Sequence, residues 1–270
     1  KWNDISPIKV KKGEKAGFGY AAVSVDARNP KHLIVSTHYL DGKHGYRSDE
    51  MFRSTDRGRS WTPIFKSGHE YDCSKAPYVR IAPLHWMFDI EIDPFNSEHA
   101  MFTTGFGGWE TFNLSANERG EKVIWSLLSE GIEETVPLEL YAPAEGARLI
   151  SGVGDYGSFT HRDLTRPAQE GSHANPHFAN CNGVTGAWLR QEMIVRVGYP
   201  FHNPTALGIS YSEDGGDSWT QCSSVPVEGA RNGHIAVSAD GSNWIWTPDR
   251  SDAYITVDKG ESWIQCQGLP

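Results

Sequence analysis

Apolar and polar residues alternate in short segments along most of the chain, and a period of two predicts β-strands. An alternating strand followed by a polar turn recurs, and a second strand comes after each turn. The clearest copies start at residues 21, 89 and 234, with second strands at 32–37, 99–104 and 243–247. Looser copies pair 138–141 with 147–152 and 192–197 with 206–210. This repetition predicts four-stranded blades that begin near residues 20, 88, 138, 192 and 234.

A second repeat has the pattern S/T-x-D-x-G-x-S-W and occurs at Ser54–Trp61, Ser212–Trp219 and Thr256–Trp263. Such a segment suits a tight hairpin turn. The Asp accepts hydrogen bonds from turn amides, the Gly permits a positive φ, and the Trp packs beneath the turn. The repeat resembles the Asp-box, or BNR repeat, of β-propellers. We expect these residues to fasten blades, and we place none of them in an active site.

Composition supports an all-β fold, because 28 Gly, 15 Pro and 10 Trp in 270 residues favour short strands joined by turns over helix bundles. No apolar run approaches the roughly 20 residues of a membrane helix. Residues 1–7 are expected to be the last strand of a preceding blade, and residues 8–270 to form about five blades of one propeller domain. Because an open propeller leaves exposed strand edges, we expect the chain to be a segment of a longer polypeptide.

The formal net charge is −9, and the one basic run, at residues 9–12, is too short for a phosphate-binding surface. Nucleic acid and insertion into a membrane are therefore not expected, and a neutral ligand fits better. None of the four cysteines forms a C-x-x-C pair, so no metal site and no cofactor are predicted. Cys222 and Cys266, each three residues after a Trp, are either a disulfide or two buried free thiols.

Nearly the whole chain is similar to the central part of glycoside hydrolase family 74, the xyloglucanases and related endo-β-1,4-glucanases. The matching runs are Gly17–Tyr20, Phe52–Asp56, Glu91–Ser97, Gly131–Thr135 and Leu149–His161. The resemblance implies part of the second of two seven-bladed propellers, which face each other across a cleft and cleave glucans with inversion. It also implies an extracellular, periplasmic or cell-surface protein.

The chain departs from the family pattern at Ser158, at Arg162 and in the insert from residue 168 to 188. These departures bear on substrate preference more than on the type of reaction.

Asp155 is the candidate general acid. It follows the apolar strand 149–153 and lies between Gly154 and Gly157, which allow a sugar to approach the backbone closely. Apolar surroundings would raise the pKa of its carboxyl group, as a general acid requires. By spacing alone an ordinary turn Asp is the favoured interpretation, and it is the resemblance that assigns the acid role.

Inverting hydrolysis needs a second carboxylate, as base, about 6.5–9.5 Å from the first. The resemblance implies that this base comes from the first propeller, which no part of the chain matches, and hence an association with that missing portion. Asp89 is interpreted as a structural residue at a strand start, and Glu133 and Glu134 as partners of loop amides.

Aromatic rings stack on the apolar faces of pyranoses, and Trp86, Trp109 and Tyr156 are candidates for this contact. Trp109 follows a Gly-rich segment that we interpret as a loop at the cleft rim. His161 and Arg162 follow Asp155 closely enough in sequence to be candidate substrate contacts.

Two other function classes remain open at this point. A sialidase-like exo-glycosidase would need three arginines on a carboxylate, which the arginines near turns do not indicate. A non-catalytic Asp-box propeller that binds glycans or proteins would need no carboxyl pair. The favoured hypothesis is a glycoside hydrolase that cleaves polysaccharides or oligosaccharides of the β-1,4-glucan class, such as xyloglucan.

Overall fold

The computed structural model describes residues 2–11, 13–81, 86–131, 135–200, 203 and 205–268. Within these ranges the chain forms twenty β-strands, one single-turn helix, α1 (Ile64–Ser67), and two short 3-10 turns. This confirms the all-β prediction. Glu133 and Glu134 lie outside the described residues. Among the described residues, no helix is long and apolar enough to cross a membrane.

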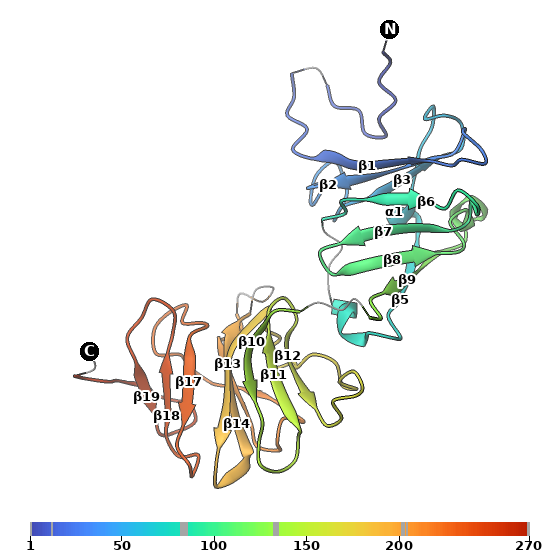
Figure 1. Cartoon of the computed structure of the whole chain (residues 1–270). Helices are drawn as coiled ribbons and strands as arrows, with labels where there is room; N and C mark the ends of the chain where they lie inside the picture. The colour runs from blue at the N-terminus through green and yellow to red at the C-terminus, as the bar shows by residue number, and fades with distance from the viewer. Residues whose placement is uncertain are drawn as a thin grey trace. The chain divides into compact units, whose positions relative to one another are not determined.

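The chain divides into two compact units, residues 1–133 and 134–270. The first unit holds two blades (Figure 1). One is an antiparallel sheet of β1 (Gly19–Val25), β2 (Leu33–His38), β3 (Met51–Ser54) and β4 (Thr62–Pro63). The other has the order β5-β9-β8-β7-β6, made of β5 (His69–Asp72), β6 (Ile90–Ile92), β7 (Ala100–Thr104), β8 (Gly107–Thr111) and β9 (Val123–Leu128).

The second unit holds three groups of strands. The first group is β10 (Pro137–Tyr141), β11 (Leu149–Val153) and β12 (Gly157–His161). The second is β13 (Asn180–Ala187), β14 (Arg190–Tyr199), β15 (Ile209–Ser212) and β16 (Thr220–Gln221). A parallel bridge between Gly157 and Asn180 joins these two groups into one seven-stranded sheet. The last group is β17 (His234–Val237), β18 (Trp244–Thr247), β19 (Tyr254–Thr256) and β20 (Ile264–Gln265).

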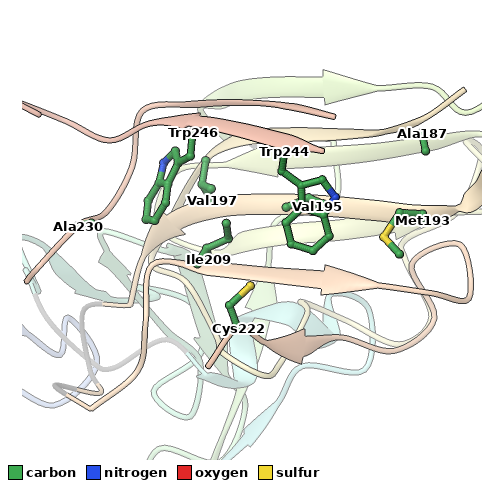
Figure 2. Close-up of a cluster of buried hydrophobic side chains, with 9 residues drawn as sticks. All are labelled: Ala187, Met193, Val195, Val197, Ile209, Cys222, Ala230, Trp244 and Trp246. Atoms are coloured by element: carbon green, nitrogen blue, oxygen red, sulfur yellow. The ribbon is translucent and has the colours of Figure 1, made fainter. Parts of the chain in front are cut away.

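Large apolar side chains hold the last two sheets together (Figure 2). Met193, Val195 and Val197 from β14 pack with Trp244 and Trp246 from β18, and all five are at most 1% exposed. Burial of side chains of this size contributes roughly 1.5–3 kcal/mol each. This apolar contact, rather than a continuous hydrogen-bond ladder, is therefore what joins these two blades.

The repeated turn has the same hydrogen bonds in all three copies. Asp56 Oδ1 accepts the amides of Arg59 and Ser60, both at 2.9 Å, and Asp56 Oδ2 accepts the Ser60 hydroxyl at 2.7 Å. Asp214 and Asp258 make the equivalent contacts. The hydroxyl and amide of Ser60 lower the pKa of Asp56 to about 2. Each Asp is therefore used in holding its turn, as the sequence predicts.

Four of the five expected blade starts lie within a few residues of β1, β6, β10 and β17. The expected start of the fourth blade, near residue 192, is wrong. Residues 192–197 belong to β14, which is the second strand of that blade, and β13 is the first. Residues 2–7 form no strand. Instead Ile5 lies against the first repeated turn, where its carbonyl oxygen accepts the Nε1–H of Trp61 at 2.7 Å.

All four cysteines are free thiols. Cys73, Cys181 and Cys222 are buried, and Cys266 is half-buried. The structure therefore favours free thiols over a disulfide between Cys222 and Cys266, although Cys266 is less buried than expected. Burial raises the pKa of the Cys222 thiol to about 12.

Candidate active site

Asp155 lies at the tip of the tight turn between β11 and β12, where Val153 pairs with Gly157. Its side chain is exposed, and its backbone has a φ of 66°, in the left-handed region. The amide of Gly154 donates to the carbonyl of Val136 at 2.8 Å, and the amide of Tyr156 donates to the carbonyl of Gly154. These backbone hydrogen bonds fix the turn, and the carboxyl group of Asp155 is exposed to solvent.

Gly157 is required by a close approach of the chain. It has a φ of 83°, and a Cβ atom there would lie 2.5 Å from the carbonyl oxygen of Phe178. Any side chain would force this backbone away. Gly157 is therefore required for the close packing of the turn against the Phe178 backbone. This adds to the role expected from the sequence, which is to let a sugar approach the backbone.

Asn180 contacts the candidate acid, although no pattern in the sequence singles it out. Its Oδ1 accepts the backbone N–H of Asp155 at 2.9 Å. Asn180 also begins β13, where it bridges to Gly157 on one side and pairs with Tyr199 on the other. One residue therefore ties the Asp155 turn to the neighbouring blade.

A hollow of about 450 Å³ opens beside this end of β14. Tyr199, Asn203, Leu207, Glu228 and Arg231 are among its lining residues. The Arg231 guanidinium lies over the Tyr199 ring, 4.6 Å from its centroid. An aromatic ring with a few polar groups around a cavity of this size is typical of a small-ligand site. Tyr199, which lines the hollow, pairs with Asn180, the residue that accepts the Asp155 amide.

The surroundings of Asp155 differ from the expectation in one respect. Its side chain is exposed, so the described residues do not enclose it in an apolar pocket. In the described part of the chain, no group of three or more His, Cys, Asp or Glu residues could hold a metal ion. The site as described is thus one carboxyl group on a fixed turn, able to exchange a proton with a bound ligand.

His161 and Arg162 do not lie near Asp155, which corrects the expectation for both. They lie at the opposite end of β12, and at about 3.3 Å per residue the strand separates them from Asp155 by about 20 Å. His161 Nε2 is 2.8 Å from the Ser151 hydroxyl, and burial lowers its pKa. Arg162 pairs with Asp217 in the second repeated turn. Both side chains therefore make their contacts at the end of the blade that lies opposite Asp155.

Trp109 is buried, so its expected place at a cleft rim is wrong. It is 4% exposed on β8, its ring is stacked on Phe102, and it packs on Tyr71 with centroids 4.9 Å apart. Thr104 pairs with Gly107, so the Gly-rich segment is a tight hairpin and not a long loop. The hairpin turns Trp109 into the core.

The other two aromatic candidates differ from each other. Tyr156 is 5% exposed, so its ring does not present a face to a ligand as expected. Trp86 is 47% exposed and agrees with the expected exposure. Trp86 belongs to the first unit and Asp155 to the second. Asp89 accepts the amide of Ile90 through Oδ1 at 2.9 Å, consistent with the structural role expected for it.

Known proteins resemble this chain over its whole length. No family model matches it. A xyloglucanase from a Paenibacillus species is 33% identical over 291 residues, covering all of this chain and 28% of that protein. The crystal structure of the glycoside hydrolase family 74 xyloglucanase from Xanthomonas campestris superposes with a TM-score of 0.88 at 36% identity, covering all of this chain and 37% of the other.

The glycoside hydrolase family 74 enzyme of Niastella koreensis also superposes, with a TM-score of 0.77 at 27% identity over 98% of this chain and 36% of that one. The chain thus spans about a third of the length of the relatives it matches.

Proposed function

This chain belongs to glycoside hydrolase family 74, and from that premise we propose that it supplies the general acid for inverting hydrolysis of β-1,4-glucans such as xyloglucan. The observation that carries the proposal is Asp155. Its carboxyl group is exposed on a turn whose backbone is fixed by Val136 and Asn180. A fixed acid is what proton delivery to a bound substrate requires.

In the proposed reaction, Asp155 donates a proton to the glycosidic oxygen as the bond to the anomeric carbon breaks. A second carboxylate, contributed by another portion of the protein, takes a proton from the water that attacks the opposite face. The two carboxyl groups stand about 6.5–9.5 Å apart in such enzymes, which leaves room for this water. The hollow lined by Tyr199 and Arg231 offers space for a sugar ring.

The site residues are proposed on this basis. Asp155 is the catalytic residue, Asn180 positions it, and Tyr199 and Arg231 contact the substrate. The three repeated turns are proposed to be Asp-boxes with structural roles only. Because polymeric glucans do not enter cells intact, we place the protein outside the cytoplasm, in an extracellular, periplasmic or cell-surface position.

The test is release of reducing sugar by the full-length protein from xyloglucan, carboxymethylcellulose and sialyllactose. Hydrolysis of xyloglucan that is lost in Asp155→Asn supports the proposal. Cleavage of sialyllactose alone would support a sialidase-like enzyme instead. Binding of glucan without hydrolysis of any substrate would favour a non-catalytic propeller.

A further inference from the structure

The strand that follows the candidate acid is held at its outer edge by an irregular segment. The blade of the acid consists of β10, β11 and β12, and β12 joins β13 through one parallel bridge in the part of the chain that the structure describes. Residues 168–179, which we call the covering segment, also form hydrogen bonds to this edge. His173 donates its amide to the carbonyl of Ser158 at 2.9 Å, and the carbonyl of Ala179 accepts the amide of Gly157 at 3.2 Å. The covering segment therefore takes the place that a fourth strand has in the next blade.

Side chains fix the covering segment to β12 through a directed chain of hydrogen bonds. Thr160 donates its hydroxyl to the carbonyl of Gly216 at 2.8 Å, so its oxygen accepts from Nε2 of His173, also at 2.8 Å. In a neutral imidazole Nδ1 is then an acceptor, and it takes the Ser158 hydroxyl at 2.8 Å. Since the Ser158 proton points to His173, the Ser158 oxygen accepts Nη1–H of Arg196 at 2.8 Å. The bonds therefore run in one direction, from Arg196 on β14 to Gly216 in the second repeated turn.

His173 is neutral in this position. Its ring is buried, and burial, followed by the charge of Arg196, keeps the pKa of the ring well below the ordinary 6.5. A neutral imidazole needs one donor and one acceptor as partners, and Ser158 and Thr160 supply them. Each hydroxyl and ring nitrogen of these three side chains is thus paired. A buried polar network that is fully paired holds a single geometry.

Arg196 also binds the covering segment directly. Its Nη2 donates to two backbone carbonyl oxygens of the segment, both at 2.7 Å, and its guanidinium lies over the Phe178 ring, 4.7 Å from the centroid. The carbonyl oxygen of Phe178 is the atom that leaves no room for a Cβ atom at Gly157. Gly157 and Ser158 are the first two residues of β12, directly after the turn that carries Asp155. The buried network therefore reaches the base of that turn.

We propose that Ser158 is a positioning residue for the candidate acid: its hydroxyl, held between His173 and Arg196, fixes the start of β12 and thereby the Asp155 turn. The inference rests on the proposed function, because Ser158 acts only through Asp155. A general acid is effective while its distance and direction to the leaving oxygen are kept, and a misplacement of about 1 Å can lower a rate about 100-fold. Ser158 is also a departure from the family pattern, and the glycine of that pattern has no hydroxyl for this link.

The experiment compares Ser158→Ala with Ser210→Ala in the full-length enzyme. Ser210 is the matched control, because it is equally buried and its hydroxyl accepts Nε–H of Arg196 at 2.8 Å, but it lies on β15. Each variant removes one acceptor of Arg196, so thermal unfolding should report a similar loss of stability. The constants kcat and KM are measured on xyloglucan and on an aryl glycoside with a good leaving group. If Ser158→Ala does not fold, Thr160→Val breaks the same chain of hydrogen bonds with a side chain of similar shape, and the same expectations apply.

We expect Ser158→Ala to lower kcat on xyloglucan about tenfold with little change in KM, and to lower kcat on the aryl glycoside less than about threefold, since that substrate needs little protonation. Ser210→Ala should keep the kcat of the wild type. Equal kcat in the two variants, or an equal loss on both substrates in Ser158→Ala, would overturn the positioning role.

Asp155→Asn in the same assays separates this inference from the proposed function. If Asp155→Asn is slow on xyloglucan and Ser158→Ala is not, the positioning role is wrong and the acid assignment stands. If Asp155→Asn hydrolyses xyloglucan at a near-normal rate, the acid assignment is wrong and the positioning role is lost with it.

Discussion

The backbone N–H of Asp155 donates a hydrogen bond to Oδ1 of Asn180, across 2.9 Å and between two blades. The two residues are 25 positions apart in the chain, and the parallel bridge from Asn180 to Gly157 brings them together. The orientation of the candidate acid therefore depends on how the third and fourth blades meet.

Replacing Asp155 by Asn should lower the rate on polymeric xyloglucan about 10²–10⁴-fold in the full-length enzyme, because the amide has no proton of suitable acidity to donate. Aryl glycosides with good leaving groups should lose less, since they need little protonation. Steady-state kinetics on both substrate types measure the contrast. Near-normal hydrolysis of the polymer would contradict the acid role, and an equal loss on both types would indicate that Asp155 positions water or the loop.

Asn180→Ala should reduce kcat by about 10- to 100-fold and change KM little, because the turn that carries the acid loses the side-chain acceptor of the Asp155 amide. Asn180→Asp keeps an acceptor for the Asp155 amide and should recover part of kcat. Kinetics and thermal unfolding of both variants are compared. A loss of stability without this split between kcat and KM would show that Asn180 is merely structural.

Arg196 should be the most sensitive buried polar residue of the second unit. It is 0% exposed on β14, donates to Ser158, Ser210 and the carbonyls of Ala174 and Pro176, and no carboxylate pairs with it among the described residues. Burial lowers its pKa to about 9, so it remains charged at neutral pH.

Arg196→Met leaves several buried acceptors without a donor and should lower the free energy of unfolding by about 3 kcal/mol or more. Arg190→Met is the control, since Arg190 lies on the same strand but makes an exposed ion pair with Glu192. It should change stability by less than about 1 kcal/mol. Urea unfolding measures both, and similar values for the two variants would disprove the role assigned to Arg196.

His99 should make the stability of the first unit depend on pH. Asp93 at 2.9 Å and Glu110 at 3.2 Å from its ring nitrogens raise its pKa above the ordinary 6.5. Because the folded-state pKa is the higher one, this stabilisation is complete below pH 6.5 and is lost as the pH rises through the folded-state value. Urea unfolding between pH 5.5 and 8.5 should therefore show a decline in the wild type that His99→Gln lacks. If the free energy of unfolding changed with pH in the same way in both proteins, the role assigned to His99 would be refuted.

Trp109→Ala should lower the free energy of unfolding by about 3–5 kcal/mol, as truncation of a buried Trp does. Cellohexaose affinity of the protein that remains folded should stay the same, because the ring does not reach the surface. Denaturant unfolding together with calorimetric titration at low temperature tests both parts. A binding defect in a stable variant would restore Trp109 as a sugar contact.

Alternation and turn chemistry were sufficient to predict most strands and all three repeated turns, because both signals are local. The start of the fourth blade was missed because residues 180–187, NCNGVTGA, contain small and polar residues in place of an alternating pattern. Trp109 was misplaced for a related reason. A Gly-rich segment suits a long loop and a tight hairpin equally well, and only the pairing of Thr104 with Gly107 decides between them.

The candidate site was predictable only in part. Asp155 stands out by its strand end and glycines. Asn180 and Tyr199 come together only through the pairing of β13 with β14, and Arg231 reaches the Tyr199 ring from the segment before β17. His161 and Arg162 illustrate the opposite error, because nearness in sequence along an extended strand becomes a separation of about 20 Å. Distance along a strand is therefore a poor guide to which side chains share a site.

Strand β5 has a consequence for how the chain acquires its fold. Each other pairing within a blade of the described structure joins strands that are consecutive in the sequence, so each can form soon after its residues are synthesised. Residues 69–72 instead pair with residues 123–126. Contacts that close long loops form slowly, so the edge of the second blade should stay open to other chains until β9 has emerged from the ribosome. That interval is when a nascent chain of this protein is most exposed to aggregation.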